Sequence, residues 1–215
     1  MAPKDRTAWK LIGKPAQRSD IPAKTNGSAR FGIDVRLPGM LFAAVRQCPM
    51  IGGTPGAVDA KAALAKPGVH KLVMLDSMGG STAGFAVVAQ SSWHARQAAE
   101  AVEVQWQQRA DGALDTARIQ AAMQEQLKTE SGFTFYSTGD AAKAEAAATR
   151  MVEADYSAPY LAHATMEPMN CTAQVQAGKV EVWVPTQVPG MARAIAAKVA
   201  GVDVEKVTLH VTLLG

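Results

Sequence analysis

The pattern of apolar and polar positions predicts alternating strands and helices over the first half of the chain. Short apolar runs bounded by proline, glycine or serine indicate strands, and apolar residues at a helical period indicate helices. Strands are expected over 40–48, 69–75, 85–90 and 102–106, and helices over 59–66 and 92–102. Residues 51–56 are expected to form a glycine- and proline-rich loop. This order predicts a compact α/β unit that ends near Trp106 and follows an irregular lead-in over residues 1–38.

The second half predicts more helix and then a second small sheet. Helices are expected over 114–127, 140–149 and 189–200, a loop or edge strand over 131–138, and strands over 150–156, 171–175, 180–184 and 207–213. Ala177 and Gly178 are placed to turn a hairpin, and Gly201 is placed to end the last helix. Residues able to cap the starts of helices are Asp59, Ser91 or Ser92, and Asp140. The chain is therefore expected to be α+β.

The composition excludes several classes of protein. Hydrophobic residues make up 48% of the 215 residues and charged residues 19%, which is typical of a globular protein with a core. The formal net charge of +3 arises from scattered basic residues, so no nucleic-acid partner is expected. No apolar run is long enough to span a membrane. The sequence also lacks the glycine fingerprints of nucleotide enzymes and the Gly-x-Ser-x-Gly element of serine hydrolases.

Cysteine and histidine do not indicate a metal site. Cys48 and Cys171 stand in apolar, strand-like runs and are expected to be buried free thiols. No Cys-x-x-Cys pair is present that could hold zinc or an iron–sulfur cluster. His70 and His210 lie in strand patterns without a partner nearby in sequence, and His94 lies on a helix, so none is expected to bind a metal.

Three parts of the sequence together resemble the large, molybdopterin-binding subunits of the xanthine dehydrogenase and aldehyde oxidase superfamily. The first, residues 20–46, contains a Gly-x-Ala-x-Phe stretch and then Leu-Pro-Gly-Met-Leu. The second is a helix and strand over 59–69, continued by residues 85–106. The third runs from His163 to Val175 and is followed by Trp-Val-Pro-Thr-Gln at 183–187. Within the superfamily, these segments are most similar to the branch that contains the isoquinoline 1-oxidoreductase beta subunits.

The resemblance implies a particular domain organisation. Residues 1–108 are expected to form the α/β hammerhead domain with its N-terminal lead-in, and residues 109–149 a helical connector. Residues 150–215 are expected to be the truncated first part of the molybdopterin-binding domain. In this family, the strand matching residues 207–214 leads into a Gly-Gly-Gly-Phe-Gly run, which places backbone amides near the molybdenum. Gly215 matches the first glycine of that run, so we expect an internal fragment with no complete set of catalytic residues.

The resemblance also suggests cofactor-binding residues, for which two interpretations remain open. His163 and Glu167 match a His-x-x-x-Glu element of the family and would either shape the cofactor pocket or bridge strands as structural polar groups. Pro168 favours a loop around them rather than a helix. Thr186 and Gln187 would either line the pterin or cap the helix that follows. Some members of the family carry a glutamine that reaches a molybdenum oxo group, but the matching position here is Leu161.

For the parent protein, the resemblance implies an oxidoreductase that hydroxylates N-heteroaromatic rings or oxidises aldehydes with oxygen from water. Its cofactor would be molybdopterin with molybdenum, in the cytosine dinucleotide form, and its electrons would leave through a small [2Fe–2S] subunit. The alternative for the isolated segment is a non-catalytic structural or subunit-docking module. Because the strand over 207–214 is expected to lack its native neighbours, it should be frayed or paired with another copy of the chain.

Overall fold

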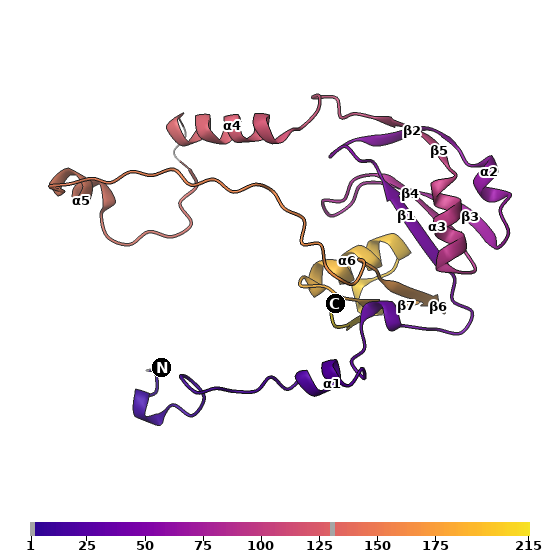
Figure 1. Cartoon of the computed structure of the whole chain (residues 1–215), viewed down its shortest axis with the longest axis horizontal. Coiled ribbons are helices and arrows are strands. Elements are labelled where there is room, and N and C mark those ends of the chain that lie inside the picture. The colour runs from indigo at the N-terminus through magenta and orange to yellow at the C-terminus, as the bar shows by residue number, and fades with distance from the viewer. Residues whose placement is uncertain (1–2, 130–131) are drawn as a thin grey trace. The chain divides into compact units, whose positions relative to one another are not determined.

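The computed structural model describes residues 3–129 and 132–215 and divides into two compact units (Figure 1). One unit is continuous, from Leu41 to His163, and the other combines Met1–Met40 with Ala164–Gly215. These boundaries differ from those of the predicted domains, because the lead-in packs with the C-terminal part of the chain. The assignment of the units to a hammerhead and a molybdopterin-binding domain remains a prediction. No described helix is both long enough and apolar enough to cross a membrane.

The unit from Leu41 to His163 is built on two antiparallel sheets. The three-stranded sheet has the order β1-β4-β3, with β1 at Phe42–Gln47, β4 at Gly84–Ala89 and β3 at Val69–Leu75. The two-stranded sheet pairs β2 (Thr54–Asp59) with β5 (Glu103–Gln107). Helices α2 (Lys61–Leu64) and α3 (Ser92–Glu100) complete this α/β part. The predicted loop over 51–56 is wrong in its second half, because β2 begins at Thr54.

The central strand β4 and helix α3 supply most of the core of this unit. Phe85, Val87 and the alanines of α3 are buried together, and Trp106 of β5 stacks on Phe85 with a centroid distance of 6.1 Å. The guanidinium of Arg46 lies over the Phe85 ring and donates to the carbonyls of Ala99 and Val102. Small side chains on α3 allow the helix to pack closely on the sheet.

Residues 108–163 contribute little to this core. Helices α4 (Thr116–Thr129) and α5 (Ala141–Ala147) confirm two predicted helices, and Asp140 caps α5 by accepting from the Lys143 N–H. Residues 148–163 form neither helix nor strand, so the strand predicted over 150–156 is wrong. Residues 132–138 also form no strand, and Ser131 of that predicted segment lies outside the described residues.

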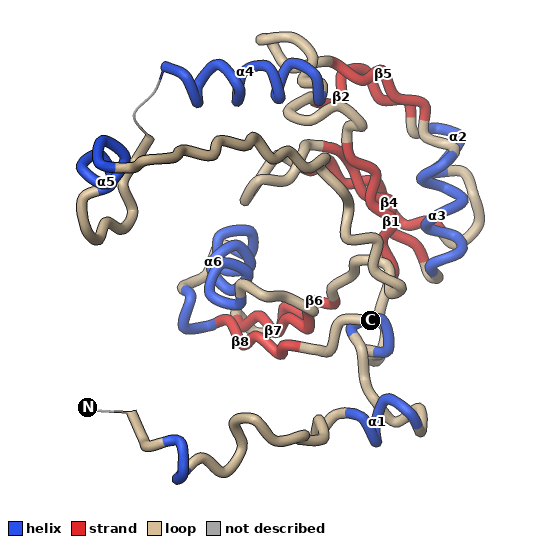
Figure 2. The backbone as a smooth tube through the Cα atoms, turned by 60° about the vertical axis from the view of Figure 1, so that its left-hand side comes forward, coloured by secondary structure: helices blue, strands red, loops and turns tan. Residues whose placement is uncertain are grey.

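The other unit is a three-stranded sheet with one helix packed against it. Its elements are η1 (Arg6–Ala8), α1 (Ile21–Thr25), η2 (Gly32–Asp34), β6 (Thr172–Gln176), β7 (Lys179–Val184), α6 (Pro189–Ala200), η3 (Val204–Lys206) and β8 (Val207–Val211). β6 and β7 form the predicted hairpin through Ala177 and Gly178, both at positive φ. Helix α6, which lies beside the sheet in Figure 2, carries the chain to β8, and β8 pairs in parallel with β7.

The predicted loss of partners by the last strand is wrong. β8 pairs with β7 along its whole length, and Leu213 then forms a parallel bridge with Phe31 of the lead-in. The sequence did not indicate a partner for this strand. Both partners come earlier in the chain: β7 lies before α6, and Phe31 lies in the lead-in. The prediction of a buried thiol is also wrong for Cys171, which is exposed, whereas Cys48 is buried.

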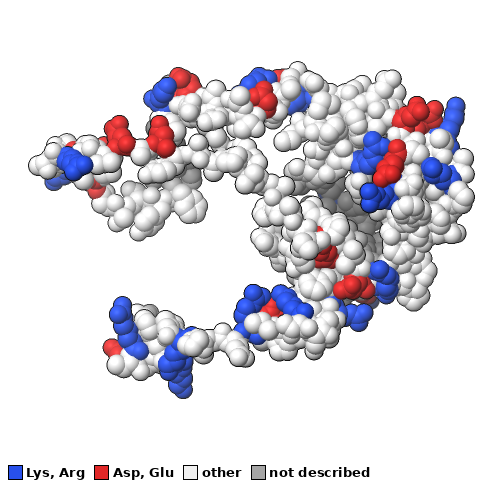
Figure 3. Space-filling model, viewed as in Figure 1, with Lys and Arg blue, Asp and Glu red and all other residues white. Residues whose placement is uncertain are grey.

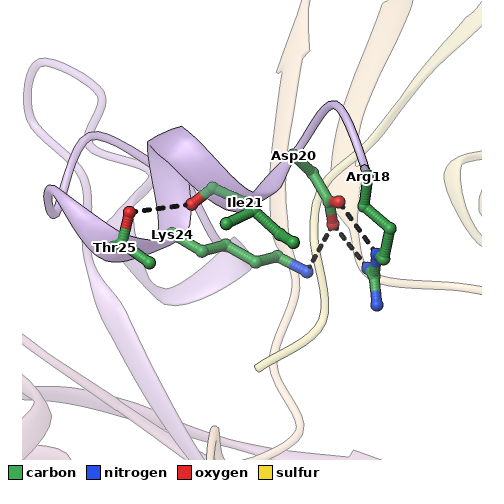
Figure 4. A network of polar contacts seen from close by, with 5 residues as sticks. All are labelled: Arg18, Asp20, Ile21, Lys24 and Thr25. Atoms are coloured by element: carbon green, nitrogen blue, oxygen red, sulfur yellow. Dashed lines mark hydrogen bonds and ion pairs between the residues drawn. The ribbon is translucent and has the colours of Figure 1, made fainter. Parts of the chain in front are cut away.

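The lead-in has its own local polar network (Figure 4). Both carboxylate oxygens of Asp20 accept from Arg18, at 3.0 and 2.6 Å, and Lys24 forms an ion pair with the same carboxylate at 2.8 Å. The hydrogen bonds from Arg18 and then from Lys24 hold the pKa of Asp20 far below its usual range. Residues 1–40 carry eight basic and three acidic residues, which places the basic excess of the chain in this segment. Acidic side chains are interspersed with basic ones elsewhere on the face drawn in Figure 3.

Candidate functional site

Glu167 is the centre of a hydrogen-bond network that joins three separate segments of one unit. Its Oε1 accepts from the Ile33 backbone N–H at 2.7 Å and from the Asn170 side-chain amide at 2.9 Å. Its Oε2 accepts from the Gly215 backbone N–H at 2.9 Å. Only 7% of Glu167 is exposed, and it is the buried charged residue among those that the structure describes. We call Ile33, Glu167, Asn170 and Gly215 the carboxylate clamp.

The loop that carries Glu167 is held by short-range hydrogen bonds. Thr165 donates through Oγ1 to the Glu167 carbonyl at 2.8 Å, and the Asn170 amide also donates to the Pro168 carbonyl at 2.8 Å. Pro168 cannot donate a backbone hydrogen bond, so a helix over this element is disfavoured and the loop turns toward the buried carboxylate. The loop predicted from Pro168 is confirmed.

Two glycines allow the clamp to close. A Cβ atom on Gly215 would lie 2.8 Å from Cβ of Glu167, and one on Gly32 would lie 2.5 Å from Oδ1 of Asn170. Both distances are shorter than real Cβ contacts, so a larger residue at either position would require Glu167, Asn170 or the backbone beside them to shift. The clamp therefore depends on glycine at both positions.

The clamp keeps Glu167 ionised. Burial by itself would raise the pKa of Glu167, but the hydrogen bonds from Asn170, Gly215 and Ile33 outweigh it and lower the pKa below the ordinary value. A carboxylate that accepts several N–H donors is stabilised in its charged form, because protonation would remove an acceptor from a donor already buried.

The structure brings together two of the candidate site residues. Glu167 and Gly215 are in direct contact. Thr186 and Gln187 follow β7, where Oγ1 of Thr186 accepts from the Val188 N–H at 3.1 Å and Gln187 is exposed. This contact supports the helix start, although Val188 itself is the capping position and provides no side-chain cap. His163 is exposed and belongs to the other unit.

A groove near the clamp was not predicted from the sequence. It has a volume of about 320 Å³ and is lined by Arg30, Phe31, Val35, Arg36, Leu37, Trp183 and Thr212. Trp183 stacks on His210 with a centroid distance of 4.8 Å, and Nε2 of His210 lies 3.1 Å from a carboxylate oxygen of Glu181. Residues from both ends of the chain line this groove, so no spacing in the sequence could have indicated it.

The residues of this unit fit an anionic cofactor at the groove better than at the clamp. All of the clamp's hydrogen bonds are internal to the chain, and its carboxylate would repel a phosphate. Arg30 and Arg36 are among the residues that line the groove, with Nη1 of Arg36 donating to the carbonyls of Ile33 and Val35, and Oγ1 of Thr212 is buried without a hydrogen-bond partner. Guanidinium groups suit phosphate oxygens. Among the described residues, no cluster of three or more His, Cys, Asp and Glu could hold a metal ion directly.

The arrangement of elements is similar to that in two solved oxidoreductases. The structure of quinoline 2-oxidoreductase from Pseudomonas putida 86 matches 94% of this chain and 30% of its own, with a TM-score of 0.66 and 21% identity. The aldehyde oxidoreductase from Desulfovibrio gigas matches 91% of this chain and 26% of its own, with a TM-score of 0.64 and 18% identity. At these identities the similarity concerns the fold alone.

Sequence comparison adds matches to a cofactor-binding domain and to subunits of known oxidoreductases. Residues 123–215 match the molybdopterin cofactor-binding domain. The beta subunit of isoquinoline 1-oxidoreductase from Brevundimonas diminuta is 32% identical over 100% of this chain and 28% of its own length. A nicotinate dehydrogenase subunit from Pseudomonas putida is 29% identical over 94% of this chain and 17% of its own length. The chain is thus similar in sequence to molybdopterin- and molybdenum-binding subunits of oxidoreductases, and it spans under a third of the length of these two relatives.

Proposed function

We propose that this chain provides part of the cofactor-binding region of a molybdopterin-dependent oxidoreductase. The observation that carries the proposal is the match of residues 123–215 to the molybdopterin cofactor-binding domain, a stretch that contains Glu167, Asn170 and Gly215 of the clamp. The cofactor, when bound, supplies the redox chemistry at molybdenum, and the protein supplies binding and orientation.

The substrate of the whole protein is proposed to be an N-heteroaromatic ring or an aldehyde, hydroxylated or oxidised with oxygen from water. Relatives named for isoquinoline and nicotinate support the heteroaromatic class, and the molybdenum-binding PaoC protein of the E. coli aldehyde oxidoreductase, 27% identical, supports the aldehyde class. We propose the cytosine dinucleotide form of the cofactor and, as electron acceptor, a separate [2Fe–2S] subunit. Both are implied by the resemblance, and the sequence has no Cys-x-x-Cys pair of its own that could hold such a cluster.

The residues proposed to lie near the cofactor are His163, Glu167, Thr186, Gln187 and Gly215. Glu167 would act through the backbone, since its carboxylate accepts from the backbone N–H groups of Ile33 and Gly215. Arg30 and Arg36 are proposed to contact the anionic part of the cofactor through the groove. Thr186 would contribute through the turn that it stabilises before α6.

The test is to measure molybdenum by elemental analysis and dye-linked oxidation of isoquinoline and of an aromatic aldehyde. Both measurements are made on the full-length protein that contains this chain and on the 215-residue chain alone. We expect about one molybdenum per full-length protein and turnover of one of the two substrates, with neither in the chain alone. A full-length protein without molybdenum would refute the proposal and favour the alternative, a non-catalytic structural or docking module.

A further inference from the structure

The turn after helix α1 carries an asparagine that is directly followed by a glycine. The chain has two asparagines, Asn26 and Asn170. Asn26 is exposed, whereas Asn170 is partly buried and its side-chain amide donates to the Glu167 carboxylate and to the Pro168 carbonyl. Asparagine is among the chemically labile residues of proteins. Of the two side-chain amides, that of Asn26 is therefore the one open to reaction.

The residue after Asn26 leaves its backbone nitrogen open to reaction. Gly27 is exposed, has a φ of 78°, and a Cβ atom placed on it would have no atom within 4 Å. Among residues 3–129 and 132–215, none accepts a hydrogen bond from the Gly27 N–H. Glycine also has no side chain to shield its nitrogen. A base in the solvent can therefore remove the proton of this N–H and make the nitrogen a nucleophile.

A local hydrogen bond holds the Asn26 side chain against the same turn. Its Oδ1 accepts from the Ser28 N–H at 2.9 Å, so the side-chain amide reaches forward across Gly27. The Asn26 N–H donates to the Pro22 carbonyl at 3.1 Å, which fixes the backbone of this residue at the end of α1. A hydrogen bond to an amide oxygen withdraws electrons from its carbon. Cγ of Asn26 is thus made more electrophilic beside the Gly27 nitrogen.

We propose that Asn26 is a self-modification site, at which the chain deamidates through attack by the backbone nitrogen of Gly27. This nitrogen loses its proton and bonds to Cγ of Asn26, the bond between Cγ and Nδ2 breaks, and Nδ2 takes up a proton and leaves as ammonia. Water then opens the resulting cyclic imide at either of its two carbonyls. The product has an aspartate or an isoaspartate at position 26, and no group is oxidised or reduced. The proposal does not rest on the proposed function.

An Asp-Gly pair elsewhere in the chain could form the same cyclic imide but is held by hydrogen bonds. The Gly112 N–H donates to the Arg109 carbonyl at 3.1 Å, and the Asp111 carboxylate accepts from the Arg109 guanidinium at 2.9 Å. Both the nucleophile and the group that it would attack are therefore engaged. Asp111 and Gly112 provide an internal control for the effect of the free N–H at Gly27.

Formation of isoaspartate would change the length of the turn. The Ala29 N–H donates to the Ala23 carbonyl at 3.0 Å and closes the turn around position 26. An isoaspartate passes the main chain through its former side chain and adds one methylene between these two residues. The chain continues to Arg30 and Phe31, which line the groove, and Phe31 bridges Leu213. The modification is therefore expected to loosen the lead-in beside the groove and to lower the formal net charge of +3 by one.

The test is incubation of the 215-residue chain in oxygen-18 water at pH 7 and pH 9, followed by tryptic digestion and mass spectrometry. Cleavage after Lys24 and Arg30 isolates Asn26 in a short peptide. We expect aspartate and isoaspartate at position 26, each with one oxygen-18 atom, formed severalfold faster at pH 9 because the attacking nitrogen must lose its proton. Asn170 and Asp111 should stay unlabelled over the same period. Labelling of Asn170 at the rate of Asn26, or a rate at Asn26 that does not change with pH, would overturn the proposal.

Two variants separate cyclic imide formation from direct hydrolysis. Gly27→Ala adds a Cβ beside the nitrogen, and Asn26→Gln keeps an amide but requires a larger ring, so each should lose its amide severalfold more slowly. Far-UV circular dichroism checks that both variants fold like the wild type. Deamidation at the wild-type rate in Asn26→Gln, or aspartate formed without isoaspartate in the wild type, would indicate direct hydrolysis and refute the attack by Gly27.

Hydrogen exchange tests the structural effect of the modification. The Ala29 amide should exchange severalfold faster in the isoaspartate product than in the unmodified chain, because its hydrogen bond to Ala23 is lost. The Val87 amide, in the buried strand β4 of the other unit, is the control and should not change. Equal exchange of the Ala29 amide before and after modification would refute the loosening of the lead-in.

Discussion

At the scale of single residues, burial and donor count decide what Glu167 does. Four-residue spacing from His163 and the resemblance together left two interpretations open, a cofactor-pocket residue and a structural bridge. In the structure its carboxylate accepts from Ile33, Asn170 and Gly215, so a bridging role is present whatever else the residue does. Each charge-assisted hydrogen bond of this kind contributes about 1.5–3 kcal/mol.

The lowered pKa of Glu167 predicts an acid-dependent loss of stability. A carboxylate with a lower pKa in the folded state contributes stability that is complete well above its ordinary value of 4.5. This contribution decreases as the pH falls below that value, because the unfolded chain takes up the proton first, and it is lost once the folded state is also protonated. We expect Glu167 to contribute to this loss of stability, because its pKa is lowered in the folded state. Chemical denaturation of the wild type between pH 7 and pH 3 measures it.

Glu167→Gln provides the comparison for that experiment, since Asp20 also has a lowered pKa and contributes to the acid response of both proteins. The stability difference between wild type and variant should be largest near neutral pH and narrow with acidification. If the stability difference between the two proteins stays constant with pH, the hydrogen bonds of the clamp do not lower the pKa of Glu167 in the folded state.

At the scale of elements, apolar periodicity and turn residues correctly predicted the helices, strands and hairpin that are determined by residues close together in sequence. Strand β3, helices α3 and α6, and the hairpin through Ala177 and Gly178 all formed where apolar period and turn residues indicated them. β2 was missed because its Thr-Pro-Gly beginning has the composition of a loop. Its register shifts between Pro55 and Val58, and pairing with β5 outweighs the local composition. Residues 150–156 show the reverse case, since alternation without a pairing partner yields no strand.

The cap of α3 gives a prediction at this scale. The Ser91 hydroxyl accepts from the His94 N–H at 3.2 Å and contacts Nδ1 of its ring at 3.1 Å. Ser91→Ala leaves that helix-starting N–H without its side-chain acceptor and is expected to lower the free energy of unfolding by about 1 kcal/mol. Urea denaturation followed by far-UV circular dichroism would measure the change. Ser92→Ala is the matched control, and an equal loss in both variants would contradict the assignment of the cap.

At the scale of the whole molecule, segments that are far apart in the sequence belong to the same compact unit. The lead-in and the last residues belong to one unit, and Leu41–His163 forms another between them in sequence. In the unit formed by Leu41–His163, the last residues carry large apolar side chains that are exposed to solvent. Those exposed by 69% or more include Phe133, Phe135, Tyr136, Val152, Tyr156, Tyr160 and Leu161. Residues 148–163 combine this exposure with the absence of a described backbone ladder.

Limited proteolysis with chymotrypsin should therefore cut first within residues 132–163. Tyr156 is 94% exposed and Tyr160 69%, whereas Phe85 is fully buried in the core of the same unit and serves as the internal control. Proteases require several residues of unpaired backbone, which regular secondary structure withholds. Mass spectrometry of the early fragments gives the order of cleavage. Cleavage after Phe85 at a rate equal to that after Tyr156 would show that the core of the unit is not formed as described.

The sequence by itself determined the mixture of helices and strands, the position of most of them, and the similarity to molybdopterin-binding proteins, because those depend on period, turn residues and local motifs. The tertiary structure alone decided which strands pair apart from the β6–β7 hairpin, and which residues share a site. Phe31 and Leu213 form a bridge although most of the chain separates them in sequence. The backbone N–H groups of Ile33 and Gly215 donate to the same carboxylate, that of Glu167. Contacts over such sequence separations arise from chain packing, and local patterns do not encode them.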